Sequence, residues 1–444
     1  MAYVPNGADE CLQMLEAIGA ASVEELFTSV PEQLRHPALE LPAPLAEQDL
    51  VAELGRLAAR NRPLGGLDSF LGAGVYRRYV PAIVRAAVAR PEFYTAYTPY
   101  QAEASQGTLQ TIFEFQTMIC GLTGLDVANA SLYDGATAAA EAVMMAVAHS
   151  GRARALVSAE LHPETRAVIH TYARGRGIEV ATSEDPAAEV GPGDACVVVA
   201  QPGFLGTVGD LAPVAEAARG AGALSICCAD PIACTLLAPP GELGFDIAVG
   251  DGQPLGVPPS FGGPHLGFMA VRQELMRRMP GRLVGLAHDH EGRRAYALTL
   301  QAREQHIRRE RATSNICTNH ALTALAATVY MARMGEGGMR RVAEVSVQRA
   351  HHLAVRLAAV DGISLAGPDR PFLWEFPLRV PGDAHDFAAA LRREGIVAGL
   401  PLGRIDPRRA DQLLVCCTET TAPAAMDRYV AAASRVVLAT AGTR

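Results

Sequence analysis

The sequence predicts an α/β protein with a large domain built on a parallel β-sheet and a smaller C-terminal α+β domain. Two observations support this class. Between residues 155 and 249, short strands that are apolar throughout alternate with helical segments, which is typical of a parallel sheet covered on both faces. After a long apolar helix that begins at Asn315, helices and strands continue to alternate to the end of the chain.

The elements that we expect can be given in chain order. Short helices separated by prolines are expected in an N-terminal arm at 8–18, 23–27 and 45–60. A longer helix is expected at 108–122. Strands are expected at 155–158, 178–181, 195–200, 224–229 and 247–249, with helices at 163–175 and 213–220. Two further strands, 265–271 and 295–300, could close the sheet.

In the C-terminal part we expect helices at 315–334, 342–357, 384–393 and 424–439, and strands at 373–378 and 412–416. The chain is thus predicted to have three parts: a helical arm at 1–64, a large α/β domain at 65–325 and a small α+β domain at 326–444.

The composition excludes several classes of function. The net charge is −8, which argues against a nucleic-acid binder. All 39 basic residues are arginine, so the chain contains no lysine. Nine scattered cysteines without a C-x2-C pair indicate reduced thiols and a cytoplasmic protein, and no spacing suggests a metal site. We expect no signal peptide and no membrane span.

A first candidate segment runs from Tyr94 to Gly107. Its fourteen residues include Pro99 and crowd together hydroxyl and amide side chains, among them Tyr94, Tyr97, Tyr100, Gln101 and Ser105. Such a segment either lines a polar pocket or forms a surface loop whose tyrosines reach a subunit contact.

A second segment, Ser131 to Ala142, opens a helix at Gly135. Free N–H groups at a helix start can bind a phosphate, but Asp134 or Thr137 could equally cap the helix. A third, Gly250 to Gly267, contains six glycines and four prolines and is too irregular for a helix or strand. It is either a ligand loop at the end of a strand or a structural crossover.

A fourth segment, Arg303 to Thr318, places Arg308, Arg309 and Arg311 near His306. Guanidinium groups suit carboxylates and phosphates, although neighbouring glutamates could neutralise them in an ordinary ion-pair network. Two residues at predicted strand ends complete the set of candidates. They are Asp230 and His162, which could instead serve as cap or turn residues.

The order of domains suits several families, one of which is the pyridoxal-phosphate enzymes of the aspartate-aminotransferase type (fold type I). In that architecture an aspartate at such a strand end faces the pyridine nitrogen of the cofactor, and a histidine or aromatic group stacks on its ring. Asp230 and His162 are the residues in question.

Several runs in the chain resemble the P-protein of the glycine cleavage system, in particular its subunit 1 (alpha) type. They are Phe70-Leu-Gly-Ala-Gly, Tyr94 to Gly107, Leu122-Thr-Gly-Leu-Asp-Val to Ala142, Phe261-Gly-Gly-Pro-His, Met279-Pro-Gly-Arg-Leu-Val-Gly and Leu298 to His320. Tyr3-Val-Pro-Asn and Met14-Leu-Glu-Ala-Ile-Gly at the N-terminus resemble one branch of the same family. The chain departs from the usual family wording at Arg311, where lysine is common.

The resemblance implies a subunit of glycine decarboxylase. In this family a second, lysine-bearing P-protein subunit (beta) holds pyridoxal phosphate. The aminomethyl group left by decarboxylation passes to the lipoamide of the H-protein, and the T-protein and L-protein complete the system. In this chain the position of the Schiff base falls near Pro254, and no lysine stands there. We therefore expect no covalently bound cofactor and no metal, and we expect this chain alone to be inactive.

The resemblance leaves two hypotheses open for an assembly of two alpha and two beta subunits. In the first, this chain supplies a wall of the active site, with Tyr94, Tyr97, Tyr100, Gln101 and Ser105 toward the substrate. Arg308 and Arg309 then face a carboxylate, a phosphate or the acidic carrier. In the second, the chain is non-catalytic: it stabilises the lysine-bearing subunit and docks the carrier.

Overall fold

The computed structural model describes residues 6–367 and 370–441. The motif Tyr3-Val-Pro-Asn lies outside this part of the chain except for its last residue. The chain divides into two compact units, residues 1–63 and 64–444. No helix in the described part is both long and apolar enough to cross a bilayer.

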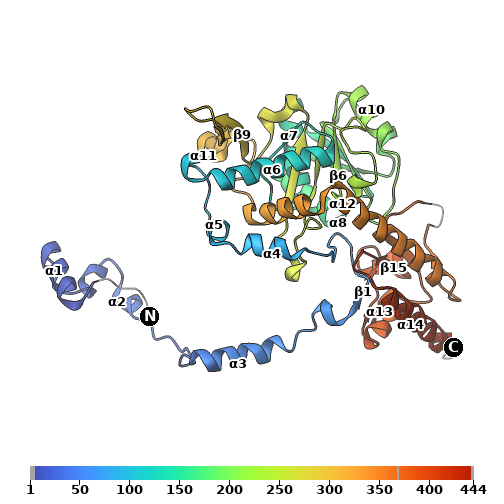
Figure 1. Ribbon diagram of the computed structural model, residues 1–444, viewed down its shortest axis with the longest axis horizontal. Coiled ribbons are helices and arrows are strands. Elements are labelled where there is room, and N and C mark those ends of the chain that lie inside the picture. The colour runs from blue at the N-terminus through green and yellow to red at the C-terminus, as the bar shows by residue number, and fades with distance from the viewer. Residues whose placement is uncertain (1–5, 368–369, 442–444) are drawn as a thin grey trace. The chain divides into compact units, whose positions relative to one another are not determined.

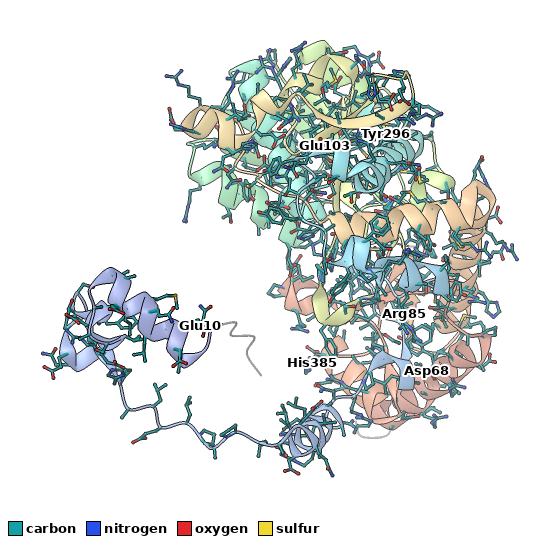
Figure 2. The ribbon with its side chains drawn as sticks, turned by 60° about the vertical axis from the view of Figure 1, so that its left-hand side comes forward. Glu10, Asp68, Arg85, Glu103, Tyr296 and His385 are labelled. Carbon is teal, nitrogen blue, oxygen red and sulfur yellow. The ribbon has the colours of Figure 1, made fainter. Side chains whose placement is uncertain are left out.

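The first unit is helical. It contains α1 (Ala8–Ile18), the 3-10 turn η1 (Glu24–Phe27), α2 (Glu32–Arg35) and α3 (Glu47–Ala58). Glu10, labelled in Figure 2, accepts a hydrogen bond from the backbone N–H of Gly7, the N-cap residue of α1. None of the described residues of this unit is buried. The expected helices are confirmed, and α2 was not predicted.

A seven-stranded sheet forms the centre of the second unit, in the order β2-β8-β7-β6-β5-β3-β4. The strands are β2 (Val127–Ala128), β3 (Arg154–Ser158), β4 (Glu179–Ser183), β5 (Cys196–Gln201), β6 (Leu224–Ala229), β7 (Ile247–Asp251) and β8 (Gly267–Val271). From β4 to β7 the strands are parallel, whereas β8 is antiparallel to both of its neighbours. The predicted apolar strands are confirmed.

One predicted strand does not belong to this sheet. Residues 295–300 correspond to β10 (Arg294–Thr299), which pairs with β9 (Leu283–His288) in a separate antiparallel ribbon. The expectation that it closes the large sheet is therefore wrong. Only residues 289–293 separate the two strands, so they pair locally. The side chain of Gln116 bonds both backbone groups of Val284 on β9.

Helices cover both faces of the sheet (Figure 1). On one face α7 (Gly135–Ser150) and α8 (Pro163–Arg174) bury alternate residues of the strands, such as Val157 and Val198. The other face carries α6 (Gln106–Thr123), α10 (Ala212–Ala221) and the long α12 (Ala321–Ala358). The alternation of buried residues explains why these strands read as apolar throughout.

Helix α12 (Ala321–Ala358) joins the large sheet to the C-terminal part. It begins six residues later than the predicted start at Asn315, because 312–320 run as an irregular loop. Two expected helices, 315–334 and 342–357, merge into one helix with a break at Gly335 (φ 62°, ψ 179°). Only glycine adopts such a backbone conformation without strain. The domain boundary that we expect at 325/326 falls inside this helix.

The C-terminal part is built on a four-stranded antiparallel sheet. Its strands are, in spatial order, β11 (Ser364–Leu365), β12 (Glu375–Arg379), β15 (Gln412–Cys416) and β14 (Leu400–Pro401), packed by α13 (Ala384–Arg393) and α14 (Pro423–Ala441). The pair β1 (Asp68–Ser69) and β13 (Ile396–Val397) attaches the start of the unit to this part. The carboxylate of Asp68 also accepts hydrogen bonds from Nε and Nη2 of Arg428 on α14.

Short helices complete the second unit. They are α4 (Ala82–Val88), α5 (Pro91–Tyr94), α9 (Pro186–Glu189) and α11 (Gln305–Arg308). Several 3-10 turns lie between the main elements: η2 (Leu64–Gly66), η3 (Ala102–Ala104), η4 (Ala233–Thr235), η5 (Ser260–Gly262), η6 (Gln273–Arg278), η7 (Gln301–Arg303), η8 (Arg309–Arg311), η9 (Leu402–Arg404) and η10 (Pro407–Arg409).

Candidate functional site

A cavity of about 550 Å³ opens at the carboxyl ends of the parallel strands. The loops after β3, β5, β6 and β7, the start of α7, and one residue of β12 contribute to it. Its lining comprises 73–76, 133–137, parts of 161–168 and 200–204, 228–230, parts of 250–254, 262–265, His320 and Glu375. The carboxyl edge of an open α/β sheet is where such folds bind ligands. We therefore take this cavity as the candidate site.

Two carboxylates accept hydrogen bonds from backbone N–H groups at the start of α7. Asp134 caps the helix, since its Oδ1 accepts from the backbone N–H of Thr137 at 2.7 Å. Asp251, at the end of β7, accepts from the backbone N–H of Gly135 at 3.1 Å. The capping interpretation of this motif is confirmed. Because the N–H groups of Gly135 and Thr137 already bond carboxylates, an added phosphate would meet negative charge at these two donors.

Asp230 and His162 both line the cavity, and both also hold local turns. The Oδ1 of Asp230 accepts from the N–H groups of Ile232 and Ala233 at 2.7 and 3.1 Å. Burial raises the pKa of Asp230, with Arg78 acting in the opposite direction. His162 accepts from the N–H of Glu164 at 3.1 Å, and burial lowers its pKa. Both residues therefore act as turn residues, as one of the two interpretations predicted, and both also line the cavity.

The glycine- and proline-rich loop after β7 folds over one side of the cavity. Its lining residues include Gly250, Asp251 and Pro254, so it is more than a crossover. Gln253, which is buried, ties the loop to the preceding part of the chain, because its side chain bonds both backbone groups of Tyr76 at 2.9 Å. The position near Pro254, where we expected a lost Schiff base, thus faces the cavity without any amine.

A histidine–carboxylate pair lies on the same loop. His265 Nδ1 is 3.0 Å from Asp251 Oδ2, and this hydrogen bond raises the pKa of His265 despite partial burial. The carbonyl of His265 accepts from His320 Nδ1 at 2.7 Å, and the ring of His320 lies 5.4 Å from that of Tyr133. These contacts connect the loop after β7 to the segment that precedes α12.

Sequence reasoning missed Glu375. This residue is 3% exposed, and its carboxylate accepts from the N–H of Ala73 at 2.5 Å and from the hydroxyl of Tyr76 at 2.7 Å. Burial raises its pKa to about 7, and the hydrogen bonds from Tyr76 and Ala73 oppose that rise. The signal was present, because a lone acid stands inside the apolar strand predicted at 373–378, and a buried acid needs partners.

The residues expected to form an active-site wall are not among those that line this cavity. The three tyrosines are 68%, 84% and 50% exposed in chain order, and Gln101, Arg308 and Arg309 are also exposed, while Ser105 is half-buried. The structure nevertheless brings their two segments together. Tyr100 accepts from Arg282 Nη2 at 3.1 Å, and its ring lies 6.1 Å from that of His306. Their role at a wall stays a prediction that depends on a partner.

The described part of the chain contains no group of three or more histidine, cysteine, aspartate or glutamate side chains placed to hold a metal ion. The cavity therefore offers carboxylates, imidazoles and backbone groups for hydrogen bonding to a ligand. It offers no lysine for a covalent bond to a carbonyl group.

Comparison with known proteins identifies the family. The family described as glycine cleavage system P-protein matches residues 1–432. A probable glycine dehydrogenase (decarboxylating) subunit 1 from Thermomicrobium roseum is 47% identical, covering 97% of this chain and 99% of its own length. The protein of the same name from Moorella thermoacetica is 48% identical, with 97% and 99% covered.

A crystal structure of an inhibitor-bound glycine decarboxylase (P-protein) of the glycine cleavage system matches with a TM-score of 0.91 and 46% identity, over 98% of this chain and 100% of that one. Sphingosine-1-phosphate lyase from Burkholderia pseudomallei, with a TM-score of 0.64 and 16% identity over 92% and 94% of the two chains, shares the fold alone. The fold is that of the aspartate-aminotransferase type, as predicted. The chain belongs to the glycine cleavage system P-protein family.

Proposed function

We propose that this chain is the subunit 1 of a glycine decarboxylase and acts together with a second, lysine-bearing subunit. The observation that carries the proposal is the absence of lysine from a chain that keeps the cavity of its fold. The names of the relatives at 47% and 48% identity support the subunit role. Glycine would be decarboxylated in the assembly, and the aminomethyl group would pass to the lipoamide of the H-protein.

Pyridoxal phosphate does not fit the cavity of this chain. No amine is available for a covalent bond, and two of the N–H groups at the start of α7 that could bind a phosphate, those of Gly135 and Thr137, already bond Asp251 and Asp134. A dianionic phosphate beside two carboxylates would be repelled. We therefore propose that the partner holds the cofactor and that the bond-breaking chemistry takes place there.

Within this proposal the chain contributes a wall to the active site of its partner. Tyr94, Tyr97 and Tyr100, with Gln101 and Ser105, present hydroxyl and amide groups on one exposed segment. Exposed tyrosines of this kind are typical of surfaces that become buried on assembly. Arg308 and Arg309 lie on a second exposed segment, which contacts the first through His306 and Tyr100. They would face a carboxylate, a phosphate or the acidic carrier protein.

We further propose an assembly of two alpha and two beta subunits in the cytoplasm, functionally linked to the T-protein and the L-protein. Nine cysteines without a disulfide support a reducing compartment. The assembly follows from the resemblance to the family, and its size can be measured by light scattering of the purified complex.

The test is a reconstitution of this chain with the lysine-bearing subunit, followed by glycine–bicarbonate exchange. Tyr97→Phe and Arg308→Ala should each lower exchange at least tenfold while the complex elutes at the same size. Arg392→Ala, which removes an exposed arginine on α13, serves as the matched control. Unchanged exchange in both variants would contradict the wall and favour a chain that only stabilises its partner. Full exchange by the partner alone would contradict both roles.

A further inference from the structure

Three segments of the second unit meet beside Tyr100, and none of their residues lines the candidate cavity. They are 94–107, 279–285 and 298–311. The guanidinium of Arg303 joins the last two segments, because its Nη2 donates to the carbonyl oxygen of Gly281 at 2.8 Å. The carbonyl oxygen of Arg282 accepts from the N–H of Ala130 at 2.9 Å. The backbone that carries the Arg282 side chain is therefore held by contacts from two other parts of the chain.

A buried ion pair lies against the hydroxyl group of Tyr100. The side chains of Arg282 and Glu304 are 3% and 6% exposed, and Arg282 Nε lies 3.8 Å from Glu304 Oε2. Arg282 Nη2 donates to the hydroxyl oxygen of Tyr100 at 3.1 Å, and the guanidinium carbon lies 5.5 Å from the centre of the tyrosine ring. His306 Nδ1 lies 3.5 Å from the same Glu304 oxygen. The orientation of the Tyr100 hydroxyl thus depends on a charged group that is itself enclosed by the fold.

This pair is a poor source of stability for the fold. The 3.8 Å between Nε and Oε2 is too long for a hydrogen bond, and within the described part of the chain neither Arg282 Nε nor Glu304 Oε1 has a hydrogen-bond partner. Buried polar atoms without partners destabilise a fold, and replacing such a pair by apolar side chains of similar volume is often neutral or stabilising. Groups that cost stability are typical of functional surfaces. The pair is therefore better explained by the geometry that it imposes on Tyr100.

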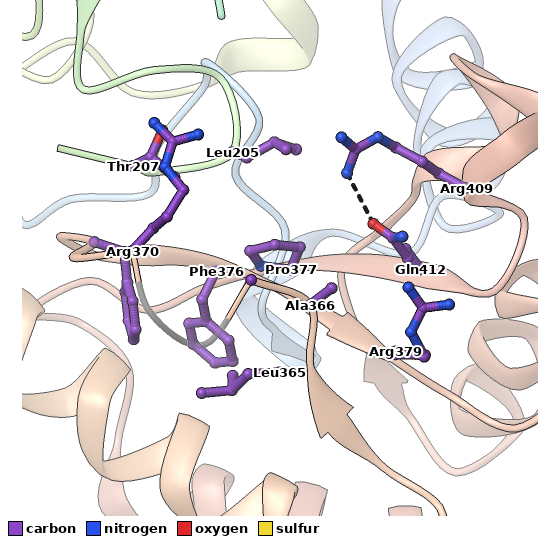
Figure 3. Close-up of a pocket in the computed structure, with 12 residues that line it drawn as sticks. Leu205, Thr207, Leu365, Ala366, Arg370, Phe376, Pro377, Arg379, Arg409 and Gln412 are labelled. Atoms are coloured by element: carbon purple, nitrogen blue, oxygen red, sulfur yellow. Dashed lines mark hydrogen bonds between the residues drawn. The ribbon is translucent and has the colours of Figure 1, made fainter. Parts of the chain in front are cut away.

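Arg379 is an ion-paired arginine in a different, solvent-exposed setting. It contributes to the lining of a second, smaller cavity of about 250 Å³ at the sheet of the C-terminal part (Figure 3). Its side chain is 52% exposed and pairs with Asp411. Water screens such a pair, so it contributes little to stability or to a fixed geometry. Arg379 therefore offers a control for Arg282.

Tyr100 differs from the other two tyrosines of its segment. Within the described part of the chain its hydroxyl is hydrogen-bonded, whereas those of Tyr94 and Tyr97 are not, and both of these residues are more exposed. Because Arg282 donates to the Tyr100 oxygen, the hydroxyl hydrogen remains available for another acceptor. A cationic donor on the oxygen also polarises the O–H bond and makes it a stronger donor.

We propose that Arg282 and Glu304 are positioning residues, which hold the Tyr100 hydroxyl as a hydrogen-bond donor to the carboxylate of glycine in the assembled enzyme. This role rests on the proposed function, in which the segment from Tyr94 to Gly107 contributes a wall to the active site of the partner. It goes beyond that wall, because it identifies which tyrosine is oriented and which buried groups orient it.

The experiment is a double-mutant cycle on the reconstituted complex, with the rate of glycine–bicarbonate exchange as the readout. One change is Tyr100→Phe, which removes only the hydroxyl. The other is the paired change Arg282→Met with Glu304→Gln, because Arg282→Met alone would leave the Glu304 carboxylate buried without its counter-charge. The last variant combines both changes, and Arg379→Met is the matched control. Unchanged elution of the complex and unchanged thermal unfolding establish that each variant folds and assembles.

Tyr100→Phe and the paired change should each lower the exchange rate about tenfold, and the combined variant should be no slower than Tyr100→Phe. A pair with a purely structural role would instead lower the rate by the same factor with or without the hydroxyl. Arg379→Met should exchange as wild type does.

The positioning role is overturned if the paired change leaves exchange at the wild-type rate, if its effect multiplies with that of Tyr100→Phe, or if Arg379→Met shows an equal loss. When Tyr100→Phe still lowers exchange in these cases, the wall of the proposed function holds and only the positioning role fails. When Tyr97→Phe, Arg308→Ala and Tyr100→Phe all exchange at the wild-type rate, the wall itself is contradicted and the positioning role fails with it.

Discussion

Replacing Glu375 with glutamine isolates the effect of one buried acid on the stability of the fold. Glu375 lies on β12 and accepts from the N–H of Ala73 and the hydroxyl of Tyr76, which belong to the start of the second unit. Glutamine has the same shape and can accept from Ala73 while its amide donates to the hydroxyl oxygen of Tyr76. The variant therefore mimics the protonated acid.

The size of the effect follows from the pKa. Burial raises the pKa of Glu375 from 4.5 to about 7, and each unit corresponds to about 1.4 kcal/mol, so the full effect is about 3 kcal/mol. Because the folded pKa lies above the unfolded one, the contribution is complete below pH 4.5 and is lost as the pH rises through 7. Relative to wild type, Glu375→Gln should gain about 2 kcal/mol of unfolding free energy between pH 5 and pH 7.

The chain provides its own reporter for this measurement. Its single tryptophan, Trp374, is fully buried next to Glu375, and its ring lies 6.3 Å from that of Tyr76. Native fluorescence should titrate with a midpoint near pH 7 in wild type, as the pKa of Glu375 implies, and not in Glu375→Gln. Urea unfolding followed by the same signal gives the free energies. A stability difference that stays flat from pH 5 to pH 7, or that falls, would refute the reasoning. Glu310→Gln, on an exposed side chain, controls for the change in net charge.

Three further predictions concern the candidate site. Gly250→Ala should lower the free energy of unfolding by about 3 kcal/mol, because the added Cβ would lie 2.2 Å from a backbone oxygen of β6. Gly66→Ala is the control and should be well tolerated, since a Cβ there would have no atom within 4 Å; urea unfolding compares the two variants. Asp134→Ala should cost about 1 kcal/mol through the lost cap of α7, and a loss of less than about 0.3 kcal/mol would contradict that role. Asp251→Asn should lower the pKa of His265, since their hydrogen bond is the main cause of its rise; an unmoved NMR titration of that ring would assign the rise to another group.

Most of the large sheet could be predicted from the sequence, because its strands are buried on both faces and therefore read as short apolar runs. The strand at 224–229 and the helix at 384–393 were predicted with the same bounds as the structure gives. Two of the errors concern how elements pair or join. The residue pattern at 295–300 predicts a strand but not the strand with which it pairs. This strand pairs with β9 and not with the large sheet, because β9 directly precedes it in the chain. The merging of two helices into α12 depends on a single glycine, which can either end a helix or bend it.

The candidate site was less predictable, because its polar residues are brought together by contacts between distant parts of the chain. Asp230 and His162 could be proposed from strand ends, where their positions follow from local sequence. Glu375 could not be placed, because its partners Ala73 and Tyr76 are about three hundred residues away in the chain. Likewise, the composition of the segment from Tyr94 to Gly107 predicted a polar segment but not whether it contacts a pocket of this chain or another subunit. Its exposure in this chain is consistent with a site completed by another subunit, so the exchange assay on the assembled complex is the measurement that decides the role of Tyr97.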